Sequence, residues 1–214
     1  MSKVPVVSVL SLKGGVGKTS VTLGLAGAAT VRGLATLVID LDPQGNATSI
    51  LAAEEPTATA ADLLANPTLA NLHNSLTACA WEVAPGEVDV IASSPELIQH
   101  DAFKSAAAFK PRLARALEKL DGYDLVLIDC PPSLGTLTRD ALAASDLAII
   151  VATPTYFGLQ GAERAADEIE EIRKTHNKKL KLLGVLPNRV KSVAEEHDFR
   201  IKELGSIFKK QVLT

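Results

Sequence analysis

A glycine-rich loop lies near the start of the chain, and it limits the possible folds more than any other segment. The loop covers residues 13–20, with the sequence KGGVGKTS. It follows the β-branched run Val4–Ser11, which predicts a buried strand, and it leads into Thr19–Arg32, whose apolar residues recur at helical spacing. A strand, a glycine loop and a helix in this order predict a phosphate-binding loop. The glycines let successive backbone N–H groups converge, and the helix points its positive end at the same place.

The loop residues have separate expected roles in binding ATP and Mg²⁺. Lys18 would supply a fixed cation for the β- and γ-phosphates, and the Thr19 hydroxyl can ligate Mg²⁺. The backbone of the glycines would surround the phosphate oxygens. The predicted ATP-binding residues of the loop are Lys13, Gly14, Gly15, Val16, Gly17, Lys18, Thr19 and Ser20.

Carboxylates follow two further predicted strands. Leu34–Leu41 is apolar and is bracketed at its end by Asp40 and Asp42, and Asp124–Asp129 ends in an acid as well. Acids at strand ends can cap a helix or form a turn. Three of them beside one phosphate loop instead favour a metal site, because ligands bind at the carboxyl edge of α/β sheets. The predicted metal ligands are Thr19, Asp40 and Asp129.

The rest of the chain alternates apolar strands with helices. Further strands are predicted at 88–92, 147–152 and 180–186, and helices at 59–65, 136–144, 158–175 and 193–208. Residues 95–120 read as mostly helical, with Pro111 interrupting them. Strands that are apolar throughout predict an α/β fold, a doubly wound, mostly parallel sheet with helices on both faces. With no internal repeat or linker, we expect residues 1–214 to form one domain.

Composition excludes several other classes of protein. No apolar stretch approaches the roughly 18 residues that a membrane span needs. Cys79 and Cys130 lie far apart and lack metal-ligand spacing, so neither a disulfide framework nor a zinc site is expected. The default expectation is a reduced, cytoplasmic protein.

Charge is distributed unevenly along a chain of net charge −3. Residues 171–214 carry 11 Lys and Arg against 5 Asp and Glu, whereas residues 1–170 carry 11 against 20. A basic C-terminal part beside an acidic body suggests a surface for a polyanion. A solvated, lysine-rich helix face would give the same pattern, and charge alone leaves both interpretations open.

The phosphate loop departs from the general GxxxxGK[ST] pattern, because Leu12 stands at the first glycine position and Lys13 precedes Gly14. The resulting xKGGxGK[ST] resembles the deviant Walker A motif of P-loop NTPases in the ParA/MinD superfamily. Residues 40–48, DLDPQGNAT, and residues 129–135, DCPPSLG, resemble the two switch segments of ParA/Soj-type partition ATPases. The similarity runs from about Val6 to Leu186.

This resemblance implies roles for individual residues. Lys13 would reach across a homodimer to the nucleotide of the other subunit, and Gly14 would permit close approach of the two subunits. Asp42 would position the attacking water, so that the expected catalytic residues are Asp42, Lys13 and Lys18. Asn188 resembles the residue that contacts adenine in the family.

The resemblance also implies a biological function. ATP would hold a sandwich dimer together, the dimer would bind DNA without sequence preference, and a ParB-like protein would stimulate slow hydrolysis. Such a cycle segregates a plasmid, a chromosome region or another cargo, and implies a nucleoid-associated protein. The candidate DNA-binding residues are Arg189, Lys191, Arg200, Lys202, Lys209 and Lys210.

Three alternative functions are compatible with a phosphate loop of this kind. A MinD-like, membrane-associated cell-division ATPase would need a terminal amphipathic helix, and Ile207–Thr214 is too short and too mixed for one. An iron–sulfur relative would need cluster-ligating cysteines at other spacings. Relatives continue beyond Thr214 through a further strand and helix, so we expect this chain to lack that segment. A non-hydrolysing binding module would result if its absence disables the site.

Overall fold

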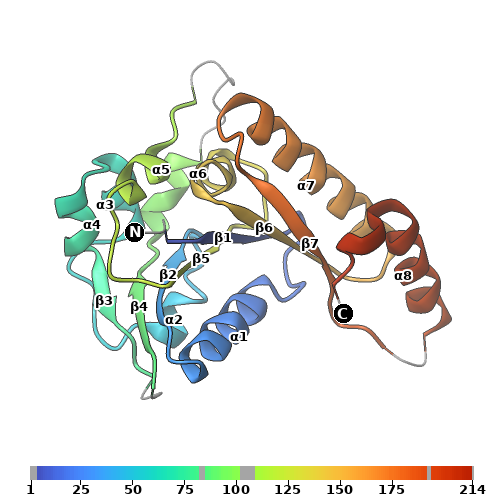
Figure 1. Ribbon diagram of the computed structural model, residues 1–214, viewed down its shortest axis with the longest axis horizontal. Helices are drawn as coiled ribbons and strands as arrows, with labels where there is room; N and C mark the ends of the chain where they lie inside the picture. The colour runs from blue at the N-terminus through green and yellow to red at the C-terminus, as the bar shows by residue number, and fades with distance from the viewer. Residues whose placement is uncertain (1–3, 82–84, 102–108, 192–193, 214) are drawn as a thin grey trace.

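A seven-stranded sheet forms the centre of the computed structural model, which describes residues 4–81, 85–101, 109–191 and 194–213 (Figure 1). The strands are β1 (Val6–Leu10), β2 (Ala35–Asp40), β3 (Leu76–Ala78), β4 (Glu87–Ile91), β5 (Leu125–Asp129), β6 (Leu147–Ala152) and β7 (Lys181–Pro187). Their order is β3-β4-β2-β5-β1-β6-β7, and only the β3–β4 pair is antiparallel. The predicted mostly parallel α/β sheet is confirmed.

Helices cover both faces of this sheet. They are α1 (Lys18–Val31), α2 (Thr48–Leu51), α3 (Ala60–Ala65), α4 (Leu69–Asn74), α5 (Arg112–Leu117), α6 (Thr136–Ala144), α7 (Tyr156–Thr175) and α8 (Glu195–Phe208), with 3₁₀ turns η1 (Pro95–His100) and η3 (Lys209–Gln211). In Figure 1, α1 lies on one side of the sheet and α5, α6 and α7 lie on the other. None of the helices in the described ranges is both long and apolar enough to cross a bilayer.

The two faces build two separate hydrophobic clusters. Val6 of β1 belongs to the cluster that contains Leu137 of α6 and Ala165 of α7. Its neighbour Val7 belongs to the opposite cluster, with Ala26 of α1. Successive strand residues point to opposite faces, so a strand covered on both sides must be apolar throughout. This explains the uninterrupted apolar runs in the sequence.

The largest error in the predicted elements concerns residues 95–120. Only η1 and α5 are helical in the described part of this segment, and residues 102–108 lie outside it. Pro111 stands immediately before α5, where a proline without an N–H starts a helix but cannot continue one. The predicted helix 193–208 is α8, although Val193 lies outside the described residues.

Three short elements, α2, α4 and β3, were not predicted. Each has six residues or fewer, too short to display a helical or alternating period. β3 is an antiparallel edge strand with one buried residue, Thr77.

The strand order indicates where on the sheet a ligand can bind. β1 lies between β5 and β6, so chain connections leave it in both directions. Ligands bind at such a switch point, outside the carboxyl ends of the strands. β2 and β5 also pair there in register, with Asp40 directly opposite Asp129.

Candidate active site

The phosphate loop connects β1 to α1 through two left-handed glycines. Gly15 has φ 72° and Gly17, the N-cap of α1, has φ 97°. Side chains other than hydrogen rarely tolerate these values, so the sequence KGGVGK can close a turn that most sequences cannot. The turn directs the N-terminus of the 14-residue helix α1 into the space beyond the sheet edge.

Asn188, the residue after β7, holds this loop from the other end of the chain. Its side-chain amide Nδ2 donates to the Val16 carbonyl at 2.7 Å, and its backbone N–H donates to the Ala152 carbonyl at 2.8 Å. A Cβ at Gly17 would collide with the same amide. The structure therefore places Asn188 against the loop backbone, and close approach as well as φ requires glycine at position 17.

A pocket of about 390 Å³ opens in front of the loop. Its described lining residues come from the loop and α1, from the segment after β2 including α2, and from the segments after β5 and β7: Gly14, Gly15, Gly17, Lys18, Thr19, Ser20, Leu23, Asp42, Gln44, Asn46, Ile50, Pro132 and Arg189. We call it the phosphate pocket. The structure thus brings the predicted cation Lys18, the predicted ligand Thr19 and the predicted water-positioning Asp42 to one cavity.

Asp40 and Asp129 lie fully buried behind this pocket. The Thr19 hydroxyl donates to Asp129 Oδ2 at 2.7 Å, and the Thr22 hydroxyl lies 3.2 Å from Asp129 Oδ1. Asp40 Oδ2 accepts from both the backbone N–H and the hydroxyl of Thr48, each at 2.8 Å. Hydroxyl and amide donors therefore orient both carboxylates.

Burial makes these two carboxylates hard to ionise. It raises the pKa of Asp129 to about 7, with the nearby negative charge of Asp40 adding to the rise and the Thr19 hydrogen bond opposing it. Burial likewise raises the pKa of Asp40 above its usual range. Two adjacent buried acids of this kind favour a cation between them and the phosphates. Hydroxyl and carboxylate oxygens are the ligands that Mg²⁺ prefers, so the donor set fits this metal.

Asp42 differs from the two buried acids because it lines the pocket, with 7% of its surface exposed. Its Oδ1 accepts from the Gln44 backbone N–H at 3.0 Å. Its carbonyl oxygen accepts from the Ser93 hydroxyl, at the end of β4, at 2.5 Å. Asp42 therefore presents an oriented carboxylate to the cavity.

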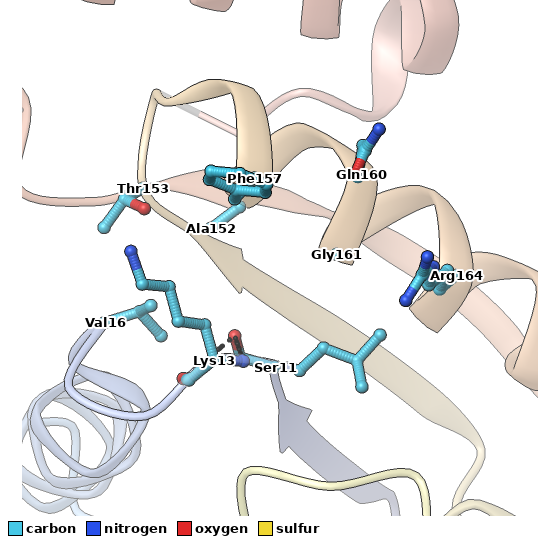
Figure 2. Close-up of a pocket in the computed structure, with 11 residues that line it drawn as sticks. Ser11, Lys13, Val16, Ala152, Thr153, Phe157, Gln160, Gly161 and Arg164 are labelled. Atoms are coloured by element: carbon cyan, nitrogen blue, oxygen red, sulfur yellow. Dashed lines mark hydrogen bonds between the residues drawn. The ribbon is translucent and has the colours of Figure 1, made fainter.

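A second pocket, of about 330 Å³, lies on the α7 side of the loop (Figure 2). Lys13 and Val16 line it from the loop, and Phe157, Gln160 and Arg164 line it from α7. In Figure 2 the Lys13 amino group extends toward Thr153. The loop therefore separates two cavities, with Lys18 in one and Lys13 in the other.

The six candidate DNA-binding residues fall into three environments. Arg189 lines the phosphate pocket with a left-handed φ of 57°. Arg200 is engaged within the protein, because its guanidinium pairs with Glu203 at 2.6 Å and lies 5.3 Å from the centre of the Tyr156 ring. The remaining four are exposed on the loop before α8, on α8 and on η3: Lys191, Lys202, Lys209 and Lys210.

Three residues that orient the acids were not predicted from the sequence. Thr22 contacts Asp129, Thr48 contacts Asp40, and Ser93 donates its hydroxyl to the Asp42 carbonyl. Only Thr22 had a usable signal, since it follows Thr19 by three helical positions and so shares its face of α1. The other two depend on tertiary contacts.

Comparison with known proteins agrees with this arrangement. The protein family described as AAA domain, AAA_31, matches residues 4–182. The chromosome partitioning protein ParA of Myxococcus xanthus is 32% identical over 97% of this chain and 72% of its own length. The chromosome-partitioning ATPase Soj of Thermus thermophilus is 34% identical over 86% of this chain and 69% of its own length.

A solved structure has the same fold. Cobyrinic acid a,c-diamide synthase from Mycobacterium smegmatis, with bound ATP analogue and magnesium, superposes with a TM-score of 0.81. The two sequences are 28% identical, and the superposition covers 96% of this chain and 83% of that one. Sequence matches over most of both chains, together with the phosphate loop and its strand-end acids, identify the family: this chain belongs to the ParA/Soj family of partitioning ATPases, within the AAA domain family AAA_31.

Proposed function

We propose that residues 1–214 form a single ATPase domain that hydrolyses ATP slowly and thereby drives DNA partition. The observation that carries this proposal is the phosphate pocket itself, where Lys18 and Thr19 stand at a helix N-terminus in front of the paired acids Asp40 and Asp129. The relatives at 32% and 34% identity are named as chromosome-partitioning proteins, which supports DNA as the cargo.

ATP and Mg²⁺ are the proposed ligands of the phosphate pocket. The Mycobacterium smegmatis neighbour binds an ATP analogue and magnesium, and the donor set here suits the same pair. Thr19, Asp40 and Asp129 would hold the metal and its hydration shell. Mg²⁺, when bound, supplies positive charge that offsets the phosphate charge.

Hydrolysis of a phosphoanhydride needs positioning and charge more than covalent chemistry. The loop N–H groups and Lys18, which is 6% exposed, hold the phosphates in a fixed place. Asp42 lines the same cavity and has its carboxylate oriented by Gln44, so it can hold a water molecule in line with the terminal phosphate. These groups can align the water molecule and the terminal phosphate. We propose that a stimulating partner protein is needed for full activity.

A homodimer is proposed from the position of Lys13 and Gly14. Lys13 is exposed, and its amino group forms no ion pair with the residues that the structure describes. A Cβ placed on Gly14 would meet open space within this subunit. Both features leave room for a second subunit, whose ATP the Lys13 cation would contact. Loss of the terminal phosphate would then release the dimer.

Non-specific DNA is the proposed surface ligand of the dimer, and a ParB-like protein its proposed activator. Lys191, Lys202, Lys209 and Lys210 are exposed and free to contact phosphate backbones. Arg200 is already engaged with Glu203, and we assign it to the packing of α8 on α7. Contacts to phosphates alone carry no sequence preference and weaken steeply with salt. On this basis we propose a nucleoid-associated protein.

The test is duplex-DNA binding by the purified chain without nucleotide, with ADP, and with ATP and Mg²⁺, with molar mass measured in parallel. We expect a dimer that binds DNA only with ATP, and that persists in Asp42→Ala because hydrolysis no longer ends it. The control is Asp167→Ala, an exposed acid of α7 away from the pocket. An ATP-dependent dimer without DNA binding would refute the DNA proposal, and a failure to bind ATP would refute the ATPase proposal.

A further inference from the structure

Thr22 lies in the second turn of α1 and is fully buried. Its hydroxyl oxygen stands 3.2 Å from Asp129 Oδ1 and 3.2 Å from the Lys18 carbonyl oxygen, four residues earlier in the helix. Thr22 does not line the phosphate pocket. Any effect that it has on a bound nucleotide must therefore pass through the groups that it contacts.

The group that matters is Asp129. Within the described part of the chain, two hydroxyls are the hydrogen-bond donors to its carboxylate, Thr19 on Oδ2 and Thr22 on Oδ1. A buried carboxylate depends on such donors, because it has exchanged water for them. The Thr19 hydroxyl also faces the phosphate pocket and is the proposed metal ligand. Of the two donors, Thr19 can contact a bound metal directly, whereas Thr22 can influence the pocket through its contact with Asp129.

We propose that Thr22 is a positioning residue that strengthens Mg²⁺-dependent nucleotide binding by holding the Asp129 carboxylate in its orientation toward Thr19. This inference rests on the proposed function. With Oδ1 hydrogen-bonded to Thr22, the carboxyl plane is fixed at two points and Oδ2 stays directed at the Thr19 hydroxyl. Without that bond, the carboxylate can rotate about its Cβ–Cγ bond, and one oxygen is left buried without a donor.

The Thr22 hydroxyl has one proton and two acceptors within reach. A hydrogen bond to an ionised carboxylate is stronger than one to a neutral carbonyl, so the proton turns toward Asp129 when that acid is charged. The Lys18 carbonyl loses little, because a carbonyl in the first turn of a helix also accepts the backbone N–H four residues later. The residue therefore keeps a donor on Asp129 Oδ1 while Oδ2 accepts from Thr19.

Thr30 of the same helix offers a matched control. It is also fully buried, and its hydroxyl donates to the Ala26 carbonyl at 2.8 Å, again four residues earlier. Thr22→Val and Thr30→Val each replace by a methyl group a buried hydroxyl that lies within reach of the carbonyl four residues earlier. They differ in the contact with Asp129. Thr22→Ser keeps the hydroxyl and should restore wild-type behaviour.

The experiment measures the dissociation constant of a fluorescent ATP analogue in excess Mg²⁺ and in EDTA, with thermal unfolding of the nucleotide-free protein as a check on folding. The ratio of the two constants is the Mg²⁺ enhancement. We expect Thr22→Val to lower the enhancement about tenfold, the value of one hydrogen bond to a charged group. The constant in EDTA should change less than about twofold, and Thr30→Val should keep the wild-type enhancement.

The inference is overturned if Thr22→Val keeps the wild-type enhancement, or if it weakens binding equally with and without Mg²⁺, as general damage to α1 would. If Thr22→Val does not fold, Thr22→Ala takes its place, with Thr30→Ala as the control. A wild-type chain that shows no Mg²⁺-dependent binding would refute the proposed function instead, and that outcome is visible before any variant is compared.

Discussion

Removal of the Arg112 guanidinium should destabilise the protein strongly, because it leaves a buried acid without its cation. Asp140 of α6 is fully buried, and its Oδ2 accepts from Arg112 Nε at 2.9 Å. Its Oδ1 accepts from the Arg112 backbone N–H at 2.7 Å. The other side of the guanidinium contacts His100 Nδ1 at 2.8 Å. Arg112→Met keeps the volume and the backbone bond but removes the charge.

The expected loss follows from two opposing effects. Breaking a buried ion pair by removing one partner costs about 3–5 kcal/mol. Burial already raises the pKa of the Asp140 carboxyl, although Arg112 opposes the rise. Without Arg112 that pKa rises further, and proton uptake limits the cost to about 3 kcal/mol, the lower end of the range. For a chain of 214 residues this corresponds to a fall in Tm of roughly 6–12 °C.

Urea unfolding at pH 7 and pH 5 checks the prediction. A carboxyl whose folded pKa lies above its unfolded pKa gains stability as pH falls through the folded value, so the deficit of Arg112→Met should shrink at pH 5. His100 loses its contact with Arg112 in the same variant, so His100→Gln serves as the reference background. The double variant Arg112→Met/Asp140→Leu leaves no buried charge at this site and should recover to within about 1 kcal/mol of wild type. A loss below about 1 kcal/mol in Arg112→Met, or no recovery in the double variant, would refute this reasoning.

Three further outcomes are expected. Gly14→Val should fold normally, with Tm within about 2 °C of wild type, since a Cβ at this position meets open space within the subunit. It should abolish the ATP-dependent dimer in light-scattering measurements. Arg189→Ala should weaken binding of an ATP analogue about tenfold by removing a cation from the phosphate pocket, whereas Lys191→Ala should leave it unchanged. Equal ATP-analogue affinities in Arg189→Ala and wild type would contradict a role for Arg189 in nucleotide binding. In thiol titrations of the native protein, Cys79 should react before Cys130, which is fully buried and whose pKa burial raises, and rapid reaction of both would contradict the structure.

The elements around the phosphate pocket could be predicted from sequence because each carries a local signal. The strand before Lys13 is a short β-branched run, and the helix after it begins where the glycines end. The predicted boundaries of β1 and α1 differ from the observed ones by no more than two residues. Strands buried on both faces cannot be mistaken for surface loops.

The remaining features depend on contacts between distant segments. Asp40 and Asp129 are recognisable as strand-end acids, but their direct opposition is a matter of register between β2 and β5. The anchoring of the loop by Asn188 joins positions 172 residues apart. Arg189 follows it into the phosphate pocket, although its charge alone suggested DNA. Composition can indicate that such a residue is charged, while only the fold decides which ligand it faces.

The central position of β1 has a consequence for synthesis of the chain. β1 leaves the ribosome before the other six strands of this sheet, yet Val6 pairs with Val126, about 120 residues later, and its other neighbour β6 follows later still. At 5–20 residues per second, an apolar strand and the phosphate loop wait roughly 6–24 s for their first neighbour. During that time a β-branched edge is open to other chains. Nascent chains of this protein should therefore depend on a chaperone until β5 emerges, and ATP binding should begin abruptly rather than gradually as translation proceeds.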